Sequence, residues 1–371
     1  MKIAAFNVEN LFDRAKAFNE ESSISNVIIQ GISELNNLFE KQVYSENNKI
    51  RMLELFKSLG LEKNDNGTYV VLRKIRGKII YRPRKKPIQI NANGREDWIG
   101  WAELKTAPVN EIAVLNTGRV IRDVNADVLA VVEAEDRTSL EKFSQYILNK
   151  VGDISYEQVM LIDGNDERGI DVGVMTKNNY KIDSVKSHIY DLRENGNKVF
   201  SRDSPEYRII TPNGNIVWVI PNHFKSKYGG NNPASKLKRK AQSIRVAEIY
   251  RNLINSGELN IIVLGDLNDT PYSEELEPLL GATDLKDVSL HNTFNPGEFE
   301  EIGTFNLGND ENKIDYLLLS PNLFNKVNSS GLFRKGAWAG KRPKRWETYE
   351  SIKKKIHVAS DHHVIWADIN I

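Results

Sequence analysis

The 371-residue chain contains no cysteine, which excludes disulfides, thiolate metal sites and a cysteine nucleophile. It also has no apolar run near the roughly 20 residues that a membrane helix needs. The apolar stretch 3–6 is too short for the hydrophobic region of a signal peptide, and Asn7 and Glu9 interrupt it. The missing cysteine leaves the compartment open, but the N-terminus and the lack of a membrane span favour a soluble, cytoplasmic protein without a membrane partner.

An excess of one charge sign is missing as well, because 51 Lys and Arg residues nearly balance 50 Asp and Glu residues. The total charge therefore favours no class of partner, and any contact with nucleic acid must come from a local cluster. No repeat, low-complexity run or linker rich in Pro and Gly divides the chain, and 40% of its residues are hydrophobic. We expect one large domain with insertions.

What the chain does have is a series of apolar stretches that end in polar side chains. Residues 261–264 are typical of a buried strand, and Asp266 and Asn268 follow on one side of an extended segment. The strand expected at 127–135 is followed by helical spacing, which indicates α/β organisation. Polar groups at the expected strand ends are Asn7, Glu9, Glu133, His223, Asp266, Asn268, Asp315, Asp361 and His362. Each alone is more typical of a cap or a turn, but together they indicate a site.

These residue types suit one kind of chemistry. Carboxylates and amides without cysteine form an oxygen-rich site, which favours Mg²⁺ or Mn²⁺ over zinc. His223 and His362 could transfer protons or donate hydrogen bonds to developing charge. Together these groups indicate metal-assisted hydrolysis of a phosphoester.

Two stretches are rich in basic residues. Helices expected at 25–43 and 52–59 are followed by an expected hairpin of strands 69–72 and 78–81, surrounded by Arg73, Lys74, Arg76, Lys78, Arg82, Arg84, Lys85 and Lys86. A solvated face and a contact with a phosphate backbone are both open interpretations of this hairpin. The second cluster, in which Trp338 and Trp346 are interleaved, contains Arg334, Lys335, Lys341, Arg342, Lys344 and Arg345. Basic and aromatic residues together suit phosphate contact and base stacking.

Six segments occur in the order of the motifs of a known superfamily: Asn7-Val8-Glu9, Glu133 after DVLAVV, Asn222-His223-Phe224-Lys225-Ser226-Lys227, Gly265-Asp266-Leu267-Asn268, Ile314-Asp315-Tyr316 and Ser360-Asp361-His362. In these segments the chain resembles the endonuclease/exonuclease/phosphatase superfamily. The resemblance covers most of the chain outside insertions at about 13–110 and 331–359 in a single domain, 1–371. It implies a four-layered α/β sandwich in which two mixed β-sheets are flanked by helices.

The resemblance also implies a role for each residue. Glu133 would be the principal ligand of Mg²⁺ or Mn²⁺, with Asn7, Glu9 and Asp361 as further ligands. Asp266 would orient or deprotonate the attacking water, and Asn268 would hold that water or a phosphate oxygen. His223 and His362, the latter positioned by Asp315, would stabilise the phosphate or protonate the leaving oxygen. The candidate phosphate contacts are Arg168, Lys225 and Lys227.

The superfamily acts on DNA, RNA, inositol phosphates and sphingomyelin, so the fold alone does not name the substrate. The segment 222–227 (NHFKSK) resembles that of bacterial nucleases, and both basic clusters favour nucleic acid. At 312–316 the chain lacks the Pro-Ala-Trp-Cys-Asp-Arg signature of inositol phosphatases. We therefore expect a metal-dependent nuclease acting on DNA or RNA, with DNA favoured. A phosphodiesterase or phosphatase acting on a small or lipid phosphoester is the second hypothesis, and a catalytically silent binding or scaffold protein is the third.

Overall fold

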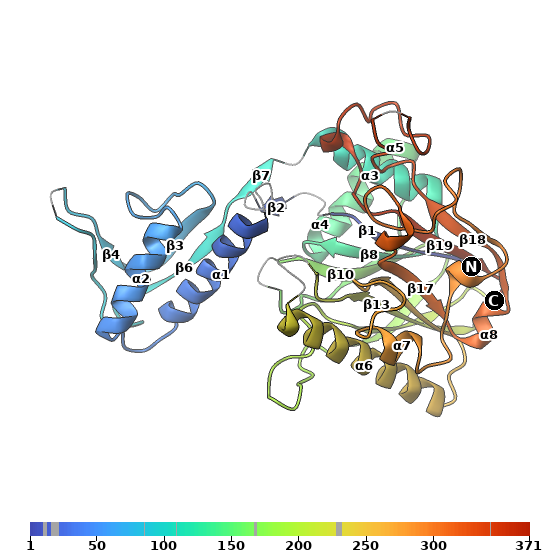
Figure 1. Ribbon diagram of the computed structural model, residues 1–371, viewed down its shortest axis with the longest axis horizontal. Helices are drawn as coiled ribbons and strands as arrows, with labels where there is room; N and C mark the ends of the chain where they lie inside the picture. The colour runs from blue at the N-terminus through green and yellow to red at the C-terminus, as the bar shows by residue number, and fades with distance from the viewer. Residues whose placement is uncertain are drawn as a thin grey trace. The chain divides into compact units, whose positions relative to one another are not determined.

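The computed structural model describes residues 1–9, 13–15, 22–84, 86–108, 110–166, 169–227, 232–341 and 343–371. Contacts within the chain define two compact units, Met1–Phe12 with Val109–Ile371, and Asp13–Pro108 (Figure 1). The range predicted as the first insertion falls in the second unit. Its standing as an insertion within a single domain stays a prediction.

The larger unit contains a mixed sheet whose two central strands, β1 (Lys2–Asn7) and β8 (Val128–Ala134), are parallel. Within the described residues this sheet has seven strands in the order β16-β18-β19-β1-β8-β10-β9. The other five strands are β16 (Phe294–Asn295), β18 (Val327–Phe333), β19 (Val364–Ile369), β10 (Asp171–Thr176) and β9 (Gln158–Leu161). β1 is nearly continuous in apolar residues because both of its faces are buried.

A second mixed sheet carries the polar strand ends that face the site. Its order among the described residues is β11-β12-β13-β14-β17-β15. The strands are β11 (Lys181–Lys186), β12 (Glu206–Ile210), β13 (Ile216–His223), β14 (Ile261–Asp266), β17 (Asp315–Leu319) and β15 (Lys286–Asp287). β13 and β14 are parallel, whereas β14 and β17 are antiparallel.

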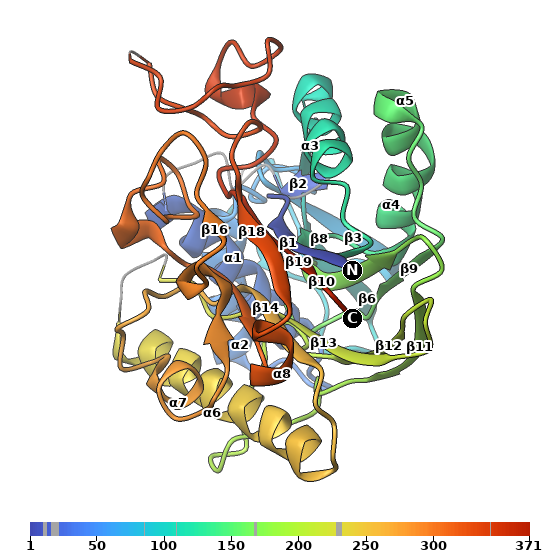
Figure 2. The ribbon, with the colours of Figure 1, turned by 90° about the vertical axis from the view of Figure 1, so that its right-hand side faces the viewer.

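The two sheets pack face to face through a fully buried apolar layer that includes Ile3 and Val128 from one sheet and Ile262 and Leu317 from the other. The helices α3 (Glu111–Val124), α4 (Arg137–Lys142) and α5 (Asn149–Gly152) lie on the outer face of the first sheet (Figure 2). The helices α6 (Pro233–Asn255) and α7 (Glu277–Leu280) cover the outer face of the second, and α8 (Pro321–Phe324) follows β17. The predicted four-layered α/β sandwich is confirmed.

The smaller unit confirms the two predicted helices, α1 (Ser22–Phe39) and α2 (Glu46–Ser58). They share one apolar cluster with two strands, β3 (Val70–Gly77) and β6 (Trp98–Leu104), that pair with each other. The remaining strand pairs are β4 (Ile80–Tyr81) with β5 (Gln89–Ile90), and β2 (Asp13–Ala15) with β7 (Thr106–Pro108).

The predicted hairpin of 69–72 with 78–81 is wrong. β3 continues through Gly77, which leaves no turn between the two stretches, and its partner is β6, more than 20 residues further along the chain. The reason is apolar complementarity, because the inward side chains of Val70 and Leu72 match the inward Trp98 and Ala102. Among the described residues, no helix in either unit is both long and apolar enough to cross a membrane.

Candidate active site

Three neighbouring strands of the second sheet bring three site residues together. His223 at the end of β13 is in register with Asp266 at the end of β14, and Asp266 is opposite Asp315 on β17. Gly265 makes this approach possible, since its φ is +117° and an added Cβ would lie 2.2 Å from the backbone oxygen of Asn222. Only glycine tolerates that geometry, so the glycine before Asp266 is required by the pairing of β13 with β14.

Asp266 lies at the centre of the site and is only 2% exposed. Its Oδ1 accepts a hydrogen bond from the backbone N–H of Asn268 at 2.8 Å, and its Oδ2 accepts from the side-chain amides of Asn268 at 3.1 Å and Asn7 at 3.3 Å. Burial, followed by the nearby charge of Asp315, raises the pKa of Asp266 well above its usual value. An ionised Asp266 is therefore a stronger base than an exposed aspartate.

His362 is paired with Asp315 across the site. Its Nδ1 lies 2.9 Å from Oδ2 of Asp315, so the carboxylate fixes the ring and leaves Nε2 facing Asn7 at 3.4 Å and Asp266 at 3.9 Å. Burial disfavours the charged ring, but the charge and hydrogen bond of Asp315 outweigh it and raise the pKa of His362 well above its usual value. His362 is thus suited to hold a proton at Nε2.

His223 connects Asp266 to the first sheet. Its Nε2 lies 3.6 Å from Oε1 of Glu133 and 3.7 Å from Oδ2 of Asp266. The side chain of Glu133 is 20% exposed, so the glutamate faces solvent from the end of β8 while His223 is buried.

The residues of the chain termini complete the site. Asn7 Oδ1 accepts from the backbone N–H of Glu9 at 3.1 Å, and Glu9 Oε2 accepts from that of Asp361 at 3.3 Å. Asp361 Oδ1 in turn lies 3.8 Å from Nε2 of His362. A continuous series of contacts therefore joins all the residues predicted as catalytic or metal-binding, namely Asn7, Glu9, Glu133, His223, Asp266, Asn268, Asp315, Asp361 and His362.

Three of these residues have left-handed backbone conformations. The φ angles of Glu9, Glu133 and Asn268 are 51°, 65° and 54°. For glutamate this conformation costs about 1–2 kcal/mol, and such strain is concentrated at functional sites. At each of these three residues the left-handed backbone changes the direction of the chain where the side chain joins the site.

The donor chemistry fits a divalent metal ion. Asn7, Glu9, Glu133 and Asp361 offer only carboxylate and amide oxygens, the ligands that hard divalent cations prefer. A second possible set of ligands is Asp266, Asp315 and His362. All three residues are buried, and their ligand atoms lie within 4.8 Å of one another. In that set the hydrogen bond between Asp315 and His362 already uses one ring nitrogen.

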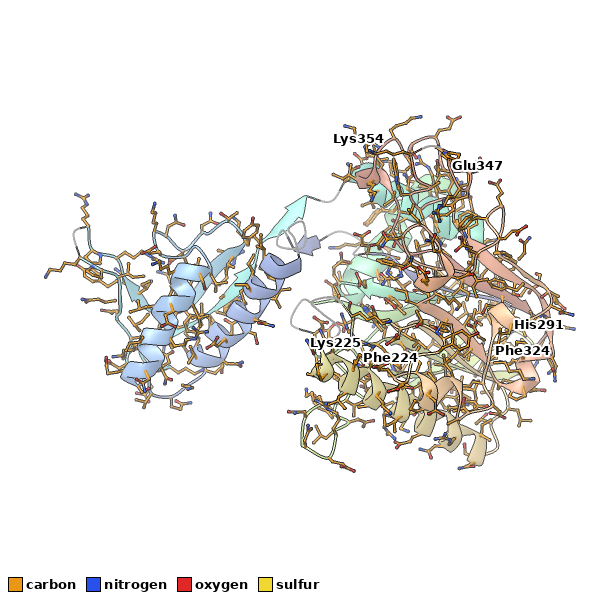
Figure 3. All side chains as sticks on the ribbon, viewed as in Figure 1. Phe224, Lys225, His291, Phe324, Glu347 and Lys354 are labelled. Carbon is orange, nitrogen blue, oxygen red and sulfur yellow. The ribbon has the colours of Figure 1, made fainter. Side chains whose placement is uncertain are left out.

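The predicted phosphate contacts have different outcomes. Arg168 lies outside the described residues. Lys227 forms an ion pair with the buried carboxylate of Asp269, which also accepts a hydrogen bond from Nε of Arg239 at 2.9 Å. Lys225 lies beside α6, where Arg239 donates to its backbone oxygen at 3.1 Å (Figure 3). Arg239 thus anchors the segment that follows His223.

Arg239 and Gln242 are supporting residues that the sequence did not reveal. The apolar residues Leu237 and Ile244 of α6 are exposed, whereas Arg239 and Gln242 of the same helix are buried. Gln242 accepts from the backbone N–H of Lys225 at 2.8 Å. The only sequence signal was their spacing of three residues on one helix face.

Thr304 is another such residue, because its hydroxyl accepts the backbone N–H of Asp315 at 2.9 Å. No motif surrounds Thr304, and its contact depends on a loop that returns to β17.

The layered fold and the cluster of carboxylates, amides and histidines at adjacent strand ends define a class of protein, the α/β-sandwich phosphoesterases. The model of the Endonuclease/Exonuclease/phosphatase family matches residues 83–337, which is more than half of the chain. The chain therefore belongs to this family, and the resemblance predicted from its motifs is confirmed. Asn7, Glu9, Asp361 and His362 lie outside the matched range. Family membership supports an enzyme that hydrolyses phosphoesters.

Solved structures of the same architecture are only distantly similar. The catalytic domain of human Nocturnin with bound sulfate is 17% identical, with 71% of this chain and 88% of that chain covered and a TM-score of 0.49. A mannosyl-6-phosphatase of Bacteroides thetaiotaomicron is 13% identical, with 70% and 90% covered and a TM-score of 0.48. Truncated TDP2 of Caenorhabditis elegans is 16% identical, with 69% and 90% covered and a TM-score of 0.47. No curated protein sequence matches this chain. These distant likenesses carry no conclusion about the substrate.

Proposed function

We propose that the protein is a divalent-metal-dependent nuclease that hydrolyses the phosphodiester backbone of DNA, with RNA as the other candidate polymer, by in-line attack of water. The observation that carries the proposal is the environment of Asp266. This buried carboxylate with a raised pKa is held by the amides of Asn7 and Asn268 and lies between two histidines. Such a group is suited to accept the proton of an attacking water.

Asn7, Glu9, Glu133 and Asp361 are the residues that would hold Mg²⁺ or Mn²⁺. When bound, the cation supplies charge that neutralises phosphoryl oxygens during hydrolysis. The protein itself orients these four donors through the strained backbone at Glu9 and Glu133 and through the hydrogen bond from Asp361 to Glu9.

His362 and His223 are the two groups able to protonate the leaving oxygen or stabilise the phosphate. Asp315 fixes the ring of His362 and favours its charged form, which leaves Nε2 as the proton donor. Asn268 donates to Asp266 and to the backbone oxygen of Phe224 at 3.2 Å, so it fixes the base relative to the segment after His223. Lys225 and Arg168 are proposed to contact the phosphate.

A polymeric substrate is favoured by a local excess of positive charge that lies outside the nine site residues. The stretch 66–94 contains eight Lys and Arg residues and no Asp or Glu, although the whole chain is nearly neutral. A polyanion is the ligand for which such a local excess is suited.

The test is to incubate the purified full-length protein with plasmid, single-stranded DNA, RNA, inositol phosphates and bis-p-nitrophenyl phosphate, with Mg²⁺, with Mn²⁺ and with a chelator. Metal-dependent cleavage of DNA, with or without cleavage of RNA, is the expected result. Turnover of the small phosphates alone would assign a phosphatase or small-molecule phosphodiesterase. Cleavage that persists in the chelator would refute the metal mechanism, and no turnover of any substrate would favour the catalytically silent protein.

A further inference from the structure

The smaller unit carries a concentrated positive surface on β3 and the segment that follows it. We define the basic surface as the exposed residues Arg73, Lys74, Arg76, Lys78, Arg84 and Lys86. Between residues 66 and 94 no acidic residue interrupts this charge. None of its residues belongs to the nine-residue site or takes part in the proposed hydrolysis.

The pairing of β3 with β6 determines which side chains share its open face. Arg73 is opposite Trp101, and both side chains are exposed, whereas their neighbours Leu72 and Ala102 face the helices. A bulge between residues 74 and 76 shifts the register, so that Arg76 lies opposite Ile99 on the face that carries Trp101. The open face therefore combines two guanidinium groups with an indole that is 42% exposed, and Glu103 on the same face pairs with Arg73 and accepts the indole N–H of Trp101 at 3.1 Å.

The charges of the basic surface are largely uncompensated. Among the described residues, no carboxylate forms an ion pair with Lys74, Lys78, Arg84 or Lys86, and Arg76 donates only to the backbone oxygen of Glu96.

Other arginines of the same unit have acidic partners, such as Arg51 with Glu34 and Arg82 with Asp65. Within the described part of the chain, the ion pair of the basic surface is that of Arg73 with Glu103. Among the described residues, Arg51, Arg82 and Arg95 outside the basic surface have carboxylate partners, whereas Arg76 and Arg84 within it have none.

The second basic cluster lacks these properties. Its Trp346 is only 4% exposed and stacks against the buried guanidinium of Arg334, and Lys335 pairs with Glu347. The ring of Trp346 is part of the core and is not available to stack on bases, so the expectation of base stacking at this cluster is wrong for Trp346. Among the described residues of the two clusters, unpaired charge lies next to an exposed aromatic ring in the first, at Arg76 and Trp101.

We propose that the basic surface of the smaller unit binds the phosphate backbone of nucleic acid without reading its sequence. Arg73 and Arg76 lie on the open face of β3, Lys74 is opposite Gly100 on the other face, and Lys78 follows the strand. The stretch from Arg73 to Lys78 spans five residue steps, about 17 Å at ~3.4 Å per residue, which is comparable to about five nucleotides of one DNA strand. A linear polyanion matches this row of charges, and Trp101 and Tyr81 offer exposed rings to unpaired bases. The inference rests on the proposed function for nucleic acid as the substrate, and it adds a second contact outside the catalytic site.

The experiment measures binding of a fluorescent DNA duplex and of a single strand to the full chain in a chelator, as a function of salt concentration. The test variant carries Lys74→Gln, Lys78→Gln and Lys86→Gln. The matched control carries Lys41→Gln, Lys57→Gln and Lys63→Gln, three exposed lysines of the same unit and the same change in charge. We expect the test variant to bind the duplex more weakly than the wild type, by up to about tenfold. The log–log salt slope of the test variant should be reduced by up to about 2.7, while the control should bind like the wild type.

An unchanged salt slope in the test variant would overturn the proposal, and so would equal losses in both variants. Binding to phosphatidylserine vesicles but to neither nucleic acid would reassign the surface to a lipid. Hydrolysis of bis-p-nitrophenyl phosphate by the wild type separates this proposal from the proposed function. If the wild type hydrolyses that diester and the salt slope of the test variant is unchanged, only the proposal for the basic surface is refuted. If DNA binds as expected but no substrate is hydrolysed, only the proposed nuclease activity is refuted.

Discussion

Asp266 is a residue at which stability and function oppose each other. Burial and the charge of Asp315 disfavour its ionised form, while the N–H of Asn268 and the charge of His362 favour it. The net pKa is raised, so the folded protein holds a carboxylate that is costly to ionise. Stability alone does not require a carboxylate here, since its ionised form is disfavoured. A buried carboxylate with a raised pKa is instead expected where a base is needed for catalysis.

We predict that Asp266→Asn lowers kcat by about a thousandfold or more, the scale of a lost general base, while the protein still folds. The amide can keep the hydrogen bond from the backbone of Asn268 and removes a buried charge. Steady-state kinetics and thermal unfolding of the same preparation check both parts. Asp153→Asn, an exposed site with a left-handed backbone, is the matched control and should retain full activity. Turnover at the wild-type rate in Asp266→Asn would remove Asp266 from the mechanism.

Asp171 at the start of β10 couples folding to pH in a different way. Burial raises its pKa to about 7 from 3.8, despite a hydrogen bond from the N–H of Gly164 at 2.9 Å, and nearby Asp166 adds to the shift. Between about pH 4 and pH 7 the unfolded chain has released this proton and the folded chain still holds it. The contribution of Asp171 to the free energy of unfolding therefore falls as pH rises through this window, by up to ~1.4 kcal/mol per pH unit.

Asp171→Asn should remove this pH-dependent contribution to the free energy of unfolding. The variant should gain stability over the wild type as pH rises from about 5 to about 8, by roughly 1–3 kcal/mol at the upper end. Urea unfolding of both proteins at several pH values measures the difference, which cancels pH effects from other groups. A flat difference for Asp171→Asn would mean that its carboxyl is already ionised in the folded protein at low pH.

At the scale of elements, the close approach of β13 to β14 depends on one glycine. We predict that Gly265→Ala destabilises the protein by about 3 kcal/mol or more, because the new methyl group would meet the backbone oxygen of Asn222 at 2.2 Å. Gly257→Ala is the control, since Gly257 also has a positive φ, +91°, but has no atom within 4 Å of the added Cβ. It should cost only about 1–2 kcal/mol. Equal losses in chemical denaturation would show that backbone conformation, and not the strand approach, requires Gly265.

Strand ends could be predicted from the sequence because their signal is local. An apolar run followed by Asp266 or His223 is visible in a few residues, and the structure brings these ends together at one edge. Partners could not be predicted in the same way, because pairing depends on residues far along the chain. The sequence of β3 contains nothing that specifies β6 as its pairing partner rather than β4, which follows it directly in the chain.

The polar part of the buried face of α6 could not be predicted from the sequence for a related reason. Helical periodicity assumes that the buried face of a helix is apolar, but the first half of α6 buries the polar side chains of Ser235, Arg239 and Gln242. Arg239 is buried there because the carboxylate of Asp269 and the backbone of Lys225 satisfy it. Those partners lie on two segments that a single sequence does not connect.

At the scale of the whole molecule, the two units have separate apolar clusters. The cluster of the smaller unit contains residues of 28–102 only, and those of the larger unit contain none of them. Cooperativity follows shared buried contacts, so separate clusters favour separate unfolding steps. This arrangement bears on the predicted single domain, because an insertion with its own core can unfold while the rest stays folded.

We predict two unfolding transitions in calorimetry of the full chain. Leu35→Ala, which opens a cavity at a fully buried position of the smaller unit, should lower only one transition, by about 2–5 kcal/mol of unfolding free energy. Leu264→Ala, equally buried between the two sheets, should lower only the other and reduce hydrolysis, since it lies on β14 next to Asp266. A single transition that both variants lower equally would show that the insertion and the sandwich fold as one cooperative domain.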